Sequence, residues 1–129
     1  MTKSFLLTEK RNKFTINAQV TALGNDVLIV FYGGKLHIGA VGMAQPRPSL
    51  KDPEKISASS SIYTYSGHKE DVVVKAVSEE VSKRLNKRVV VVAGIHWDEL
   101  SSVEIEIVMD LCRTITEKAI TEVHKWKNV

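Results

Sequence analysis

The sequence predicts an α+β fold in which a mostly antiparallel sheet of about five strands carries two helices on one face. Strand-like patterns fill most of the first 65 residues, and the chain then alternates helix, strand and helix. No internal repeat and no long linker divides its 129 residues, so a single domain over 1–129 is expected. The expected order is four strands, a helix, a strand and a helix.

The first strands are indicated by alternation. Residues 14–20 alternate apolar and polar side chains, which is the period of a half-buried strand, and residues 27–32 form a more apolar strand. The turn residues at 24–26 lie between them, so these two strands are expected to pair as a hairpin. Residues 5–9 can add a short strand before them.

A glycine pair at 33–34 separates these strands from the next one, which is expected over residues 36–43. This stretch contains Gly39 and Gly42. Glycine weakens a strand and commonly marks a bulge, or a point where a ligand or another backbone approaches closely.

Residues 44–58 contain three prolines among charged residues, so they are expected to form a mobile loop. Its basic side chains Arg47, Lys51 and Lys55 can close over a phosphorylated ligand, or the loop can simply be solvated. Residues 59–65 return to strand-like alternation.

Residues 67–71 lead into the first helix, because apolar residues then recur every four positions and form one stripe. The stripe consists of Val73, Val77, Val81 and Leu85. Acidic residues in the first turn and basic residues in the last turn favour the helix dipole.

Residues 89–92 are four consecutive valines, as expected of a central strand that is buried on both faces. Gly94 then allows a sharp change of direction. Ser101 and Glu104 fit a capping box, so a second helix should begin there. The turn between them follows the carboxyl end of a strand, where ligands commonly bind in open α/β layers.

The last helix is expected to bury one apolar stripe and can run to Trp126. The stripe comprises Ile105, Val108 or Met109, Cys112, Ile115, Ala119 and Val123. The single cysteine excludes an internal disulfide and fits a reducing cytoplasm, and its position predicts a buried, inert thiol.

Composition excludes several classes of protein. The net charge of +3 is small and no aromatic platform accompanies it, so nucleic-acid binding is not expected. No apolar run reaches the roughly 20 residues of a membrane helix, and the N-terminal apolar run is too short for a signal peptide. A cytoplasmic protein is expected.

Three of the four histidines have a glycine within two positions and lie at expected element ends. They are His37 near Gly39, His68 near Gly67, and His96 near Gly94. Histidine can bind a phosphate, a metal or the edge of a flavin, and glycine allows close backbone approach. The alternative is that each histidine merely completes a turn.

No nucleophile–base set or catalytic motif is present, which disfavours an enzyme. A metal site built from the three histidines with Glu70 or Asp71 is neither supported nor excluded by their spacing. The two acidic residues are more simply read as partners of the helix dipole.

Aromatic side chains near strand ends offer surfaces on which a flat ring ligand can stack. They are Tyr32, Tyr63, Tyr65 and Trp97. They fit equally well as core residues or as anchors of a dimer interface.

Three segments of the chain resemble the signature segments of the LpdD-like prenylated-flavin chaperones, the small D subunits associated with UbiD-type decarboxylases. The segments are Gly33-Gly34-Lys35-Leu36-His37-Ile38-Gly39, Gly67-His68-Lys69-Glu70-Asp71 and Ala93-Gly94-Ile95-His96. The resemblance extends over residues 14–107, with similar order and spacing, although the proline-rich loop is specific to this chain.

The resemblance implies a non-catalytic chaperone that binds prenylated FMN, or FMN, and protects it or passes it to an apo-decarboxylase of the UbiD type. The implied cofactor-binding residues are His37, Gly39, His68, Lys69, Gly94, His96 and Trp97. The histidines would line the site, Lys69 and the glycine amides would lie near the phosphate, and Trp97 or the tyrosines would face the ring.

The family fold also resembles that of the eukaryotic proteasome-assembly chaperones, which act as dimers. A protein-interaction module without a flavin ligand is therefore the alternative function. A homodimer is expected under either reading, because a sheet covered on one face must protect its other face or an edge.

Overall fold

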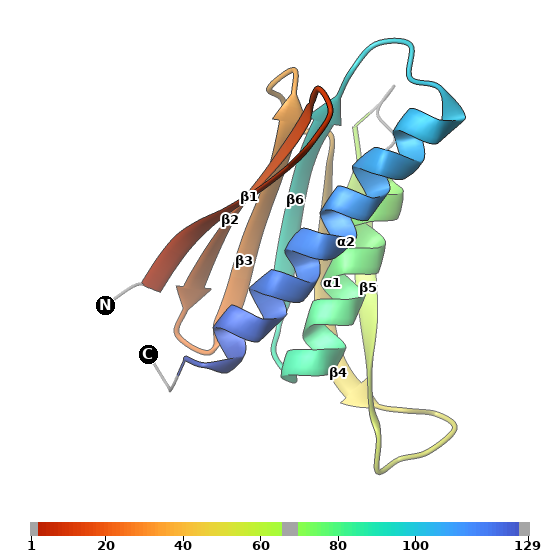
Figure 1. Ribbon diagram of the computed structural model, residues 1–129. Helices are drawn as coiled ribbons and strands as arrows, with labels where there is room; N and C mark the ends of the chain where they lie inside the picture. The colour runs from red at the N-terminus through yellow and green to blue at the C-terminus, as the bar shows by residue number, and fades with distance from the viewer. Residues whose placement is uncertain (1–2, 66–69, 127–129) are drawn as a thin grey trace.

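The computed structural model describes residues 3–65 and 70–126, which form a six-stranded sheet with two helices on one of its faces (Figure 1). In chain order the elements are β1 (Lys3–Arg11), β2 (Phe14–Leu23), β3 (Asp26–Gly34), β4 (Ala40–Pro48), β5 (Ile56–Thr64), α1 (Asp71–Leu85), β6 (Val89–His96) and α2 (Ser102–His124). The strands lie in the order β1-β2-β3-β6-β4-β5. Only β3 and β6 run parallel, so the α+β class and the mostly antiparallel sheet are confirmed.

The predicted hairpin is confirmed as β2 and β3, with Val20 opposite Ile29. The chain turns between them at Gly24, whose φ of 62° lies in the left-handed region that favours glycine. The first strand is a full partner of this hairpin, because all nine residues of β1 pair with β2.

The predicted loop over 44–58 is wrong at both ends, because β4 continues to Pro48 and β5 begins at Ile56. Tyr65 N–H donates to the Gly39 carbonyl, 2.9 Å away, and this register directs the backbone nitrogens of Pro46 and Pro48 away from β5. On the other side of β4 lies β6, which does not extend as far as the prolines, because its first residue, Val89, pairs with Ala44. No ladder needs the missing N–H groups, so proline is tolerated there.

The strand predicted over 36–43 begins only at Ala40. Gly34, with φ of 69°, turns the chain out of β3. Residues 35–39 then cross to β4 as an irregular segment, held where the Gly39 N–H donates to the Ala93 carbonyl at 2.9 Å. This segment carries His37.

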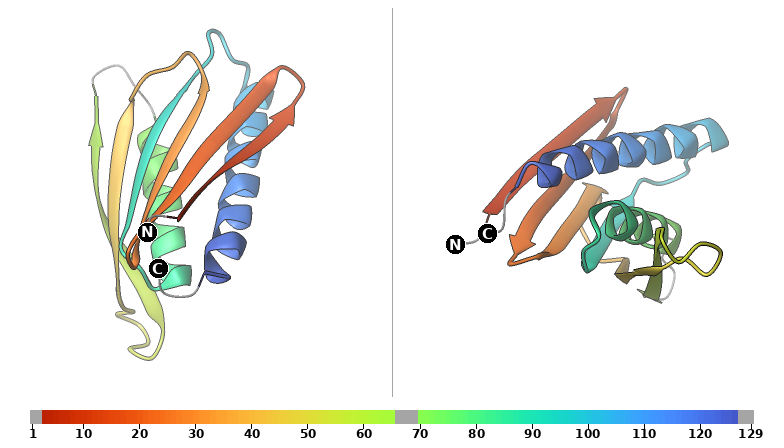
Figure 2. Two further views of the ribbon diagram at one scale, coloured as in Figure 1. Left: turned by 90° about the vertical axis from the view of Figure 1, so that its left-hand side faces the viewer. Right: turned by 90° about the horizontal axis from the view of Figure 1, so that it is seen from below.

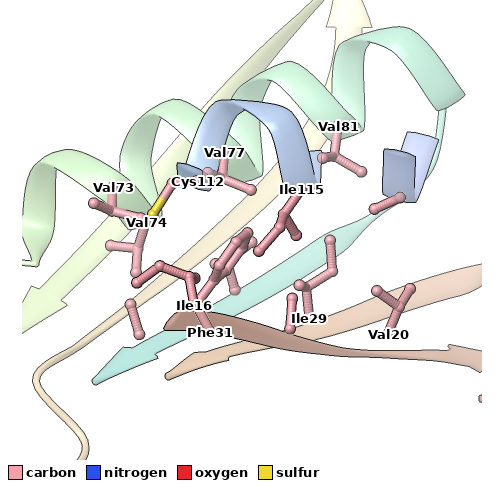
Figure 3. Packing of buried hydrophobic residues seen from close by; sticks show 14 of the residues in the cluster. Ile16, Val20, Ile29, Phe31, Val73, Val74, Val77, Val81, Cys112 and Ile115 are labelled. Carbon is pink, nitrogen blue, oxygen red and sulfur yellow. The ribbon is translucent and has the colours of Figure 1, made fainter. Parts of the chain in front are cut away.

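The core lies between the sheet and the two helices (Figure 3). The predicted α1 stripe is buried at Val73, Val77 and Val81, with Leu85 packed at its margin. The capping box of Ser101 and Glu104 begins α2 as predicted. Neither helix of the described chain is long and apolar enough to cross a membrane.

Most of the predicted α2 stripe is buried, but Ile105 is 50% exposed. It lies near the start of the helix, which projects beyond the strands (Figure 1). Cys112 is buried as predicted, and burial raises the pKa of its thiol to about 12.

The prediction that β6 is buried on both faces is wrong. Val89 and Val91 are buried under the helices, whereas Val90 and Val92 are half-exposed on the opposite face. Both helices cover the same side of the sheet (Figure 2), so valine on the other side faces outward.

Candidate functional site

The candidate site lies where the parallel strands β3 and β6 end, at the top of the sheet in Figure 1. Gly34 at the end of β3 pairs with His96 at the end of β6. The segment 35–39 and Glu70, which immediately precedes α1, meet at the same place. The carboxyl ends of two parallel strands thus bring three distant parts of the chain together.

His37 and Glu70 form the centre of this site. The His37 Nε2 atom lies 2.6 Å from the Glu70 carboxylate, and both side chains are largely buried, with 15% and 8% exposed. The same carboxylate oxygen accepts a longer hydrogen bond of 3.4 Å from the Ile95 N–H. Glu70 therefore connects the start of α1 to the end of β6 and to the segment 35–39.

Both ring nitrogens of His37 face acceptors. The Nδ1 atom lies 2.8 Å from the Lys35 carbonyl oxygen, and Nε2 faces the Glu70 carboxylate. A carbonyl and a carboxylate both require an N–H donor, so the geometry fits an imidazolium paired with a carboxylate. In this arrangement His37 has no lone pair for a metal ion.

His96 is the accessible histidine of the site. Its ring lies edge-on to that of His37, with 6.2 Å between centroids, and its side chain is 47% exposed. The Nε2 atom lies 2.9 Å from Asp98, which is itself almost fully exposed. The structure thus brings together two of the three predicted histidines and leaves one open to a ligand.

The glycines beside these histidines serve close approach between parts of the chain. A Cβ at Gly94 would overlap the carbonyl oxygen of His37, and a Cβ at Gly39 would overlap the Glu70 carboxylate. Each glycine therefore permits the contact that positions His37 and Glu70. The pattern of glycine beside histidine thus has a physical cause, because Gly94 lets the His37 backbone approach and Gly39 lets the Glu70 carboxylate approach.

The predicted aromatic residues separate into two groups. Trp97 packs edge-on against the buried Phe14, with 5.0 Å between ring centroids, so it belongs to the margin of the core. Tyr63 and Tyr65 are exposed and lie edge-on to each other on β5 and just beyond it. Because the Tyr65 N–H bonds to Gly39, this tyrosine lies beside the site.

Exposed apolar side chains also flank the site. Leu36 is 74% exposed and Ile38 is 57% exposed, on either side of the buried His37. Together with Tyr65, whose N–H bonds to Gly39, they are exposed apolar side chains next to the segment 35–39. The site thus combines polar ring nitrogens with exposed apolar side chains, as small-molecule sites generally do.

His68 and Lys69 lie outside the described residues. Within 3–65 and 70–126, no three histidine, cysteine, aspartate or glutamate side chains converge to hold a metal ion.

Glu70 is the residue whose role sequence reasoning missed. The sequence favours a helix-dipole role for Glu70 and leaves a metal site shared with the histidines open, yet its side chain caps no backbone N–H of α1 and the residue is 7% exposed. Asp71, the next residue, is exposed and fits the dipole role. Local sequence contains no signal for a pairing with a histidine that lies 33 positions away.

The chain shares its α+β fold with a protein of known structure. A chain from the structure titled "Crystal Structure of a Novel Chaperone Complex for Yeast 20S Proteasome Assembly" superposes with a TM-score of 0.57. The match covers 94% of this chain and 97% of that chain at 11% sequence identity, so it is a likeness of fold. No curated protein sequence matches the chain.

The family is defined by sequence. The prenylated flavin chaperone LpdD-like domain matches residues 10–124, which include the whole of the described site. The chain belongs to this family, and the resemblance inferred from its three histidine segments is confirmed.

Proposed function

We propose that this protein is a non-catalytic chaperone that binds prenylated FMN, or FMN, at the end of β3 and β6. It protects the cofactor or delivers it to an apo-decarboxylase of the UbiD type, in the cytoplasm. The observation that carries the proposal is the meeting of His37, Glu70 and His96 in a member of the prenylated flavin chaperone family.

The described residues divide the binding task between them. His96 and the exposed Lys35 supply N–H donors and positive charge to the phosphate. Leu36, Ile38 and Tyr65 offer apolar surface to the ring system. The His37–Glu70 pair holds the segment 35–39 in place and so positions its backbone and Lys35 beside the phosphate.

The remaining predicted residues take narrower roles in the proposal. Gly39 and Gly94 shape the site by permitting its internal contacts, and Trp97 supports the turn that carries His96. His68 and Lys69 remain proposed ligand contacts from the sequence alone. When bound, the prenylated flavin supplies the reactive group that the decarboxylase uses, and the chaperone contributes only binding and exclusion.

The test is an anaerobic calorimetric titration of the purified protein with reduced prenylated FMN and, separately, with FMN. Selective binding of the prenylated form is expected. His96→Ala should weaken binding by about tenfold through loss of a charge-assisted hydrogen bond. His37→Ala should weaken it at least as much, because the segment 35–39 loses its anchor.

His124→Ala is the matched control, because His124 is exposed at the far end of α2 and should bind as the wild type does. Unchanged affinity in both His37→Ala and His96→Ala would refute the assigned site. Failure of the wild-type protein to bind either flavin would refute the function and favour a protein-interaction module.

A further inference from the structure

The two histidines of the candidate site each have a carboxylate partner, and the two pairs differ in exposure. His37 and Glu70 are both largely buried, with 2.6 Å between the Nε2 atom and the carboxylate. His96 lies 2.9 Å from Asp98, but its side chain is 47% exposed and that of Asp98 is 93% exposed. Separating a buried pair leaves an uncompensated charge, whereas an exposed ion pair contributes little to stability. The pair of His96 and Asp98 is therefore the one that a ligand can open.

The contact with Asp98 uses the ring nitrogen that a ligand would also use. An ionised carboxylate only accepts hydrogen bonds, so the Nε2 atom of His96, the ring nitrogen farther from the backbone, is the donor. Lys35, the second residue proposed to hold the phosphate, lies beside His96, because its N–H donates to the His96 carbonyl at 3.0 Å. A phosphate oxygen that accepts from Nε2 must take the place of the Asp98 carboxylate.

Two anions compete for this nitrogen. A phosphate group carries about 1.5 to 2 negative charges near pH 7, and the carboxylate that it meets carries one more. Like charges in contact repel each other. Because Asp98 is exposed, its side chain can turn into water as the phosphate arrives. The exchange lowers the affinity for the phosphate, since one ion pair is lost when the other forms.

The turn that carries Asp98 is fixed at both ends. Residues 97–101 lead from the end of β6 to the start of α2 (Figure 1). Trp97 packs against Phe14 at the beginning of the turn, and the capping box of α2 closes its end. Between them Glu99 has a φ of 53°, in the left-handed region that is strained for a residue with a side chain. Strained backbone persists where its surroundings hold it, so the turn keeps Asp98 beside His96.

We infer that Asp98 is a built-in competitor for the phosphate of the flavin. Its carboxylate occupies His96 in the empty site, is displaced when the flavin binds, and returns to His96 when the flavin leaves. The inference rests on the proposed function and adds the control of release to it. A protein that delivers its ligand must let go of it, and a competing carboxylate in the site favours that step.

The experiment is an anaerobic calorimetric titration with reduced prenylated FMN and, separately, with the same flavin after a phosphatase has removed its phosphate. Asp98→Asn keeps the size of the side chain and removes its charge. It is expected to tighten binding of prenylated FMN about three- to tenfold, because the phosphate no longer displaces a carboxylate. Binding of the dephosphorylated flavin should stay within about twofold of the wild type, since that ligand has no anion to compete.

Glu99→Gln is the matched control, because it removes one negative charge from the next exposed position of the same turn. It should change the affinity for prenylated FMN by less than about twofold. Equal tightening by Asp98→Asn and Glu99→Gln would overturn the inference and assign the effect to net charge. Equal tightening of both flavins by Asp98→Asn would overturn it as well, because the effect would not depend on the phosphate.

The rate of release is the second readout. The tighter binding of Asp98→Asn should appear as slower dissociation, about three- to tenfold, in stopped-flow dilution of the loaded protein under nitrogen. An unchanged dissociation rate would contradict the role in release.

The wild-type titration separates this inference from the proposed function. If the wild type binds prenylated FMN and Asp98→Asn binds it no tighter, the inference fails and the proposed function stands. Weaker binding by Asp98→Asn would likewise overturn the inference, and would make Asp98 a residue that orients His96 for its ligand. A wild-type protein that binds no flavin would refute the proposed function and the inference with it.

Discussion

The outer strands β1 and β5 both belong to antiparallel hairpins, yet they are fixed to the rest of the molecule in different ways. β1 is tied to α2 by ion pairs, in which Lys118 lies 2.5 Å from Glu9 and Arg11 lies 3.6 Å from Asp110. Phe5 adds an edge-on contact with Trp126, with 5.2 Å between ring centroids. Ion pairs with α2 and the contact with Trp126 thus hold β1 in place at this side of the sheet.

β5 packs against α1 instead and carries no charged side chain. Ile62 packs against the margin of the core, and the Ser60 hydroxyl bonds to Glu79. No residue of the described chain pairs with its outer edge. Neither outer edge has a strand partner within the described chain, so the comparison teaches that two edge strands with equal ladders can differ in their charge and in how a helix holds them.

The largest expected effect concerns the anchor of β1. Phe5→Ala should lower the free energy of unfolding by about 2 to 3 kcal/mol, because the ring is half-buried between the core and Trp126. Urea denaturation measures the loss. Leu6→Ala is the control, since Leu6 is 51% exposed and should cost less than about 1 kcal/mol. Equal losses would show that β1 is not anchored by its helix-facing side.

A smaller effect is expected from adding positive charge to the edge strand β5. If the homodimer expected from the sequence forms through the uncharged edge of β5, Ser59→Lys combined with Ser61→Lys should raise its dissociation constant about tenfold, because the two lysines give β5 charges like those of β1. Both serines are exposed, so the thermal midpoint of a monomeric variant should hardly change. Lys10→Ser on β1 is the matched control and should leave the dimer as it is. Sedimentation that shows no difference between the two edges would contradict the comparison.

The smallest effect is a dependence on pH at the tie between β5 and α1. The Lys75 ammonium group and then the Ser60 hydroxyl bond to Glu79 and hold the pKa of its carboxyl below its usual 4.5. The unfolded chain therefore binds this proton first, so the stabilisation is present above pH 4.5 and is lost as the pH falls below it. Glu79→Gln should remove this acid sensitivity, a difference below about 1 kcal/mol in acid denaturation. An unchanged acid profile would show that the tie is negligible.

Local patterns predicted the elements whose causes are local. Alternation at 14–20 located β2, and Ser101 with Glu104 located the start of α2. The prolines at 46 and 48 wrongly predicted a loop, because a strand tolerates proline wherever no adjacent strand needs its backbone N–H. That neighbour depends on where β6 begins, at Val89, which is 41 residues after Pro48, and the sequence near the prolines gives no sign of it.

In the candidate site, too, local features were predicted and contacts between distant parts of the chain were not. Glycine beside histidine at element ends correctly brought His37 and His96 together. The same reasoning could not find the pairing of His37 with Glu70, because it depends on how the chain packs around Gly39 and Gly94. The sequence alone could not decide whether Trp97 stacks on a ligand or belongs to the core. Its packing against Phe14 places it at the margin of the core.

The burial of Cys112 has a consequence under the proposed function, in which the protein holds an oxygen-sensitive flavin. Reduced flavins release peroxide when they meet oxygen, and peroxide attacks thiolates far faster than thiols. With a pKa near 12, the one cysteine of the chain stays protonated at any physiological pH and is shielded between the helices and the sheet. Under the proposed function, the protein can therefore meet peroxide released by its flavin without sulfenylation or disulfide cross-linking of Cys112.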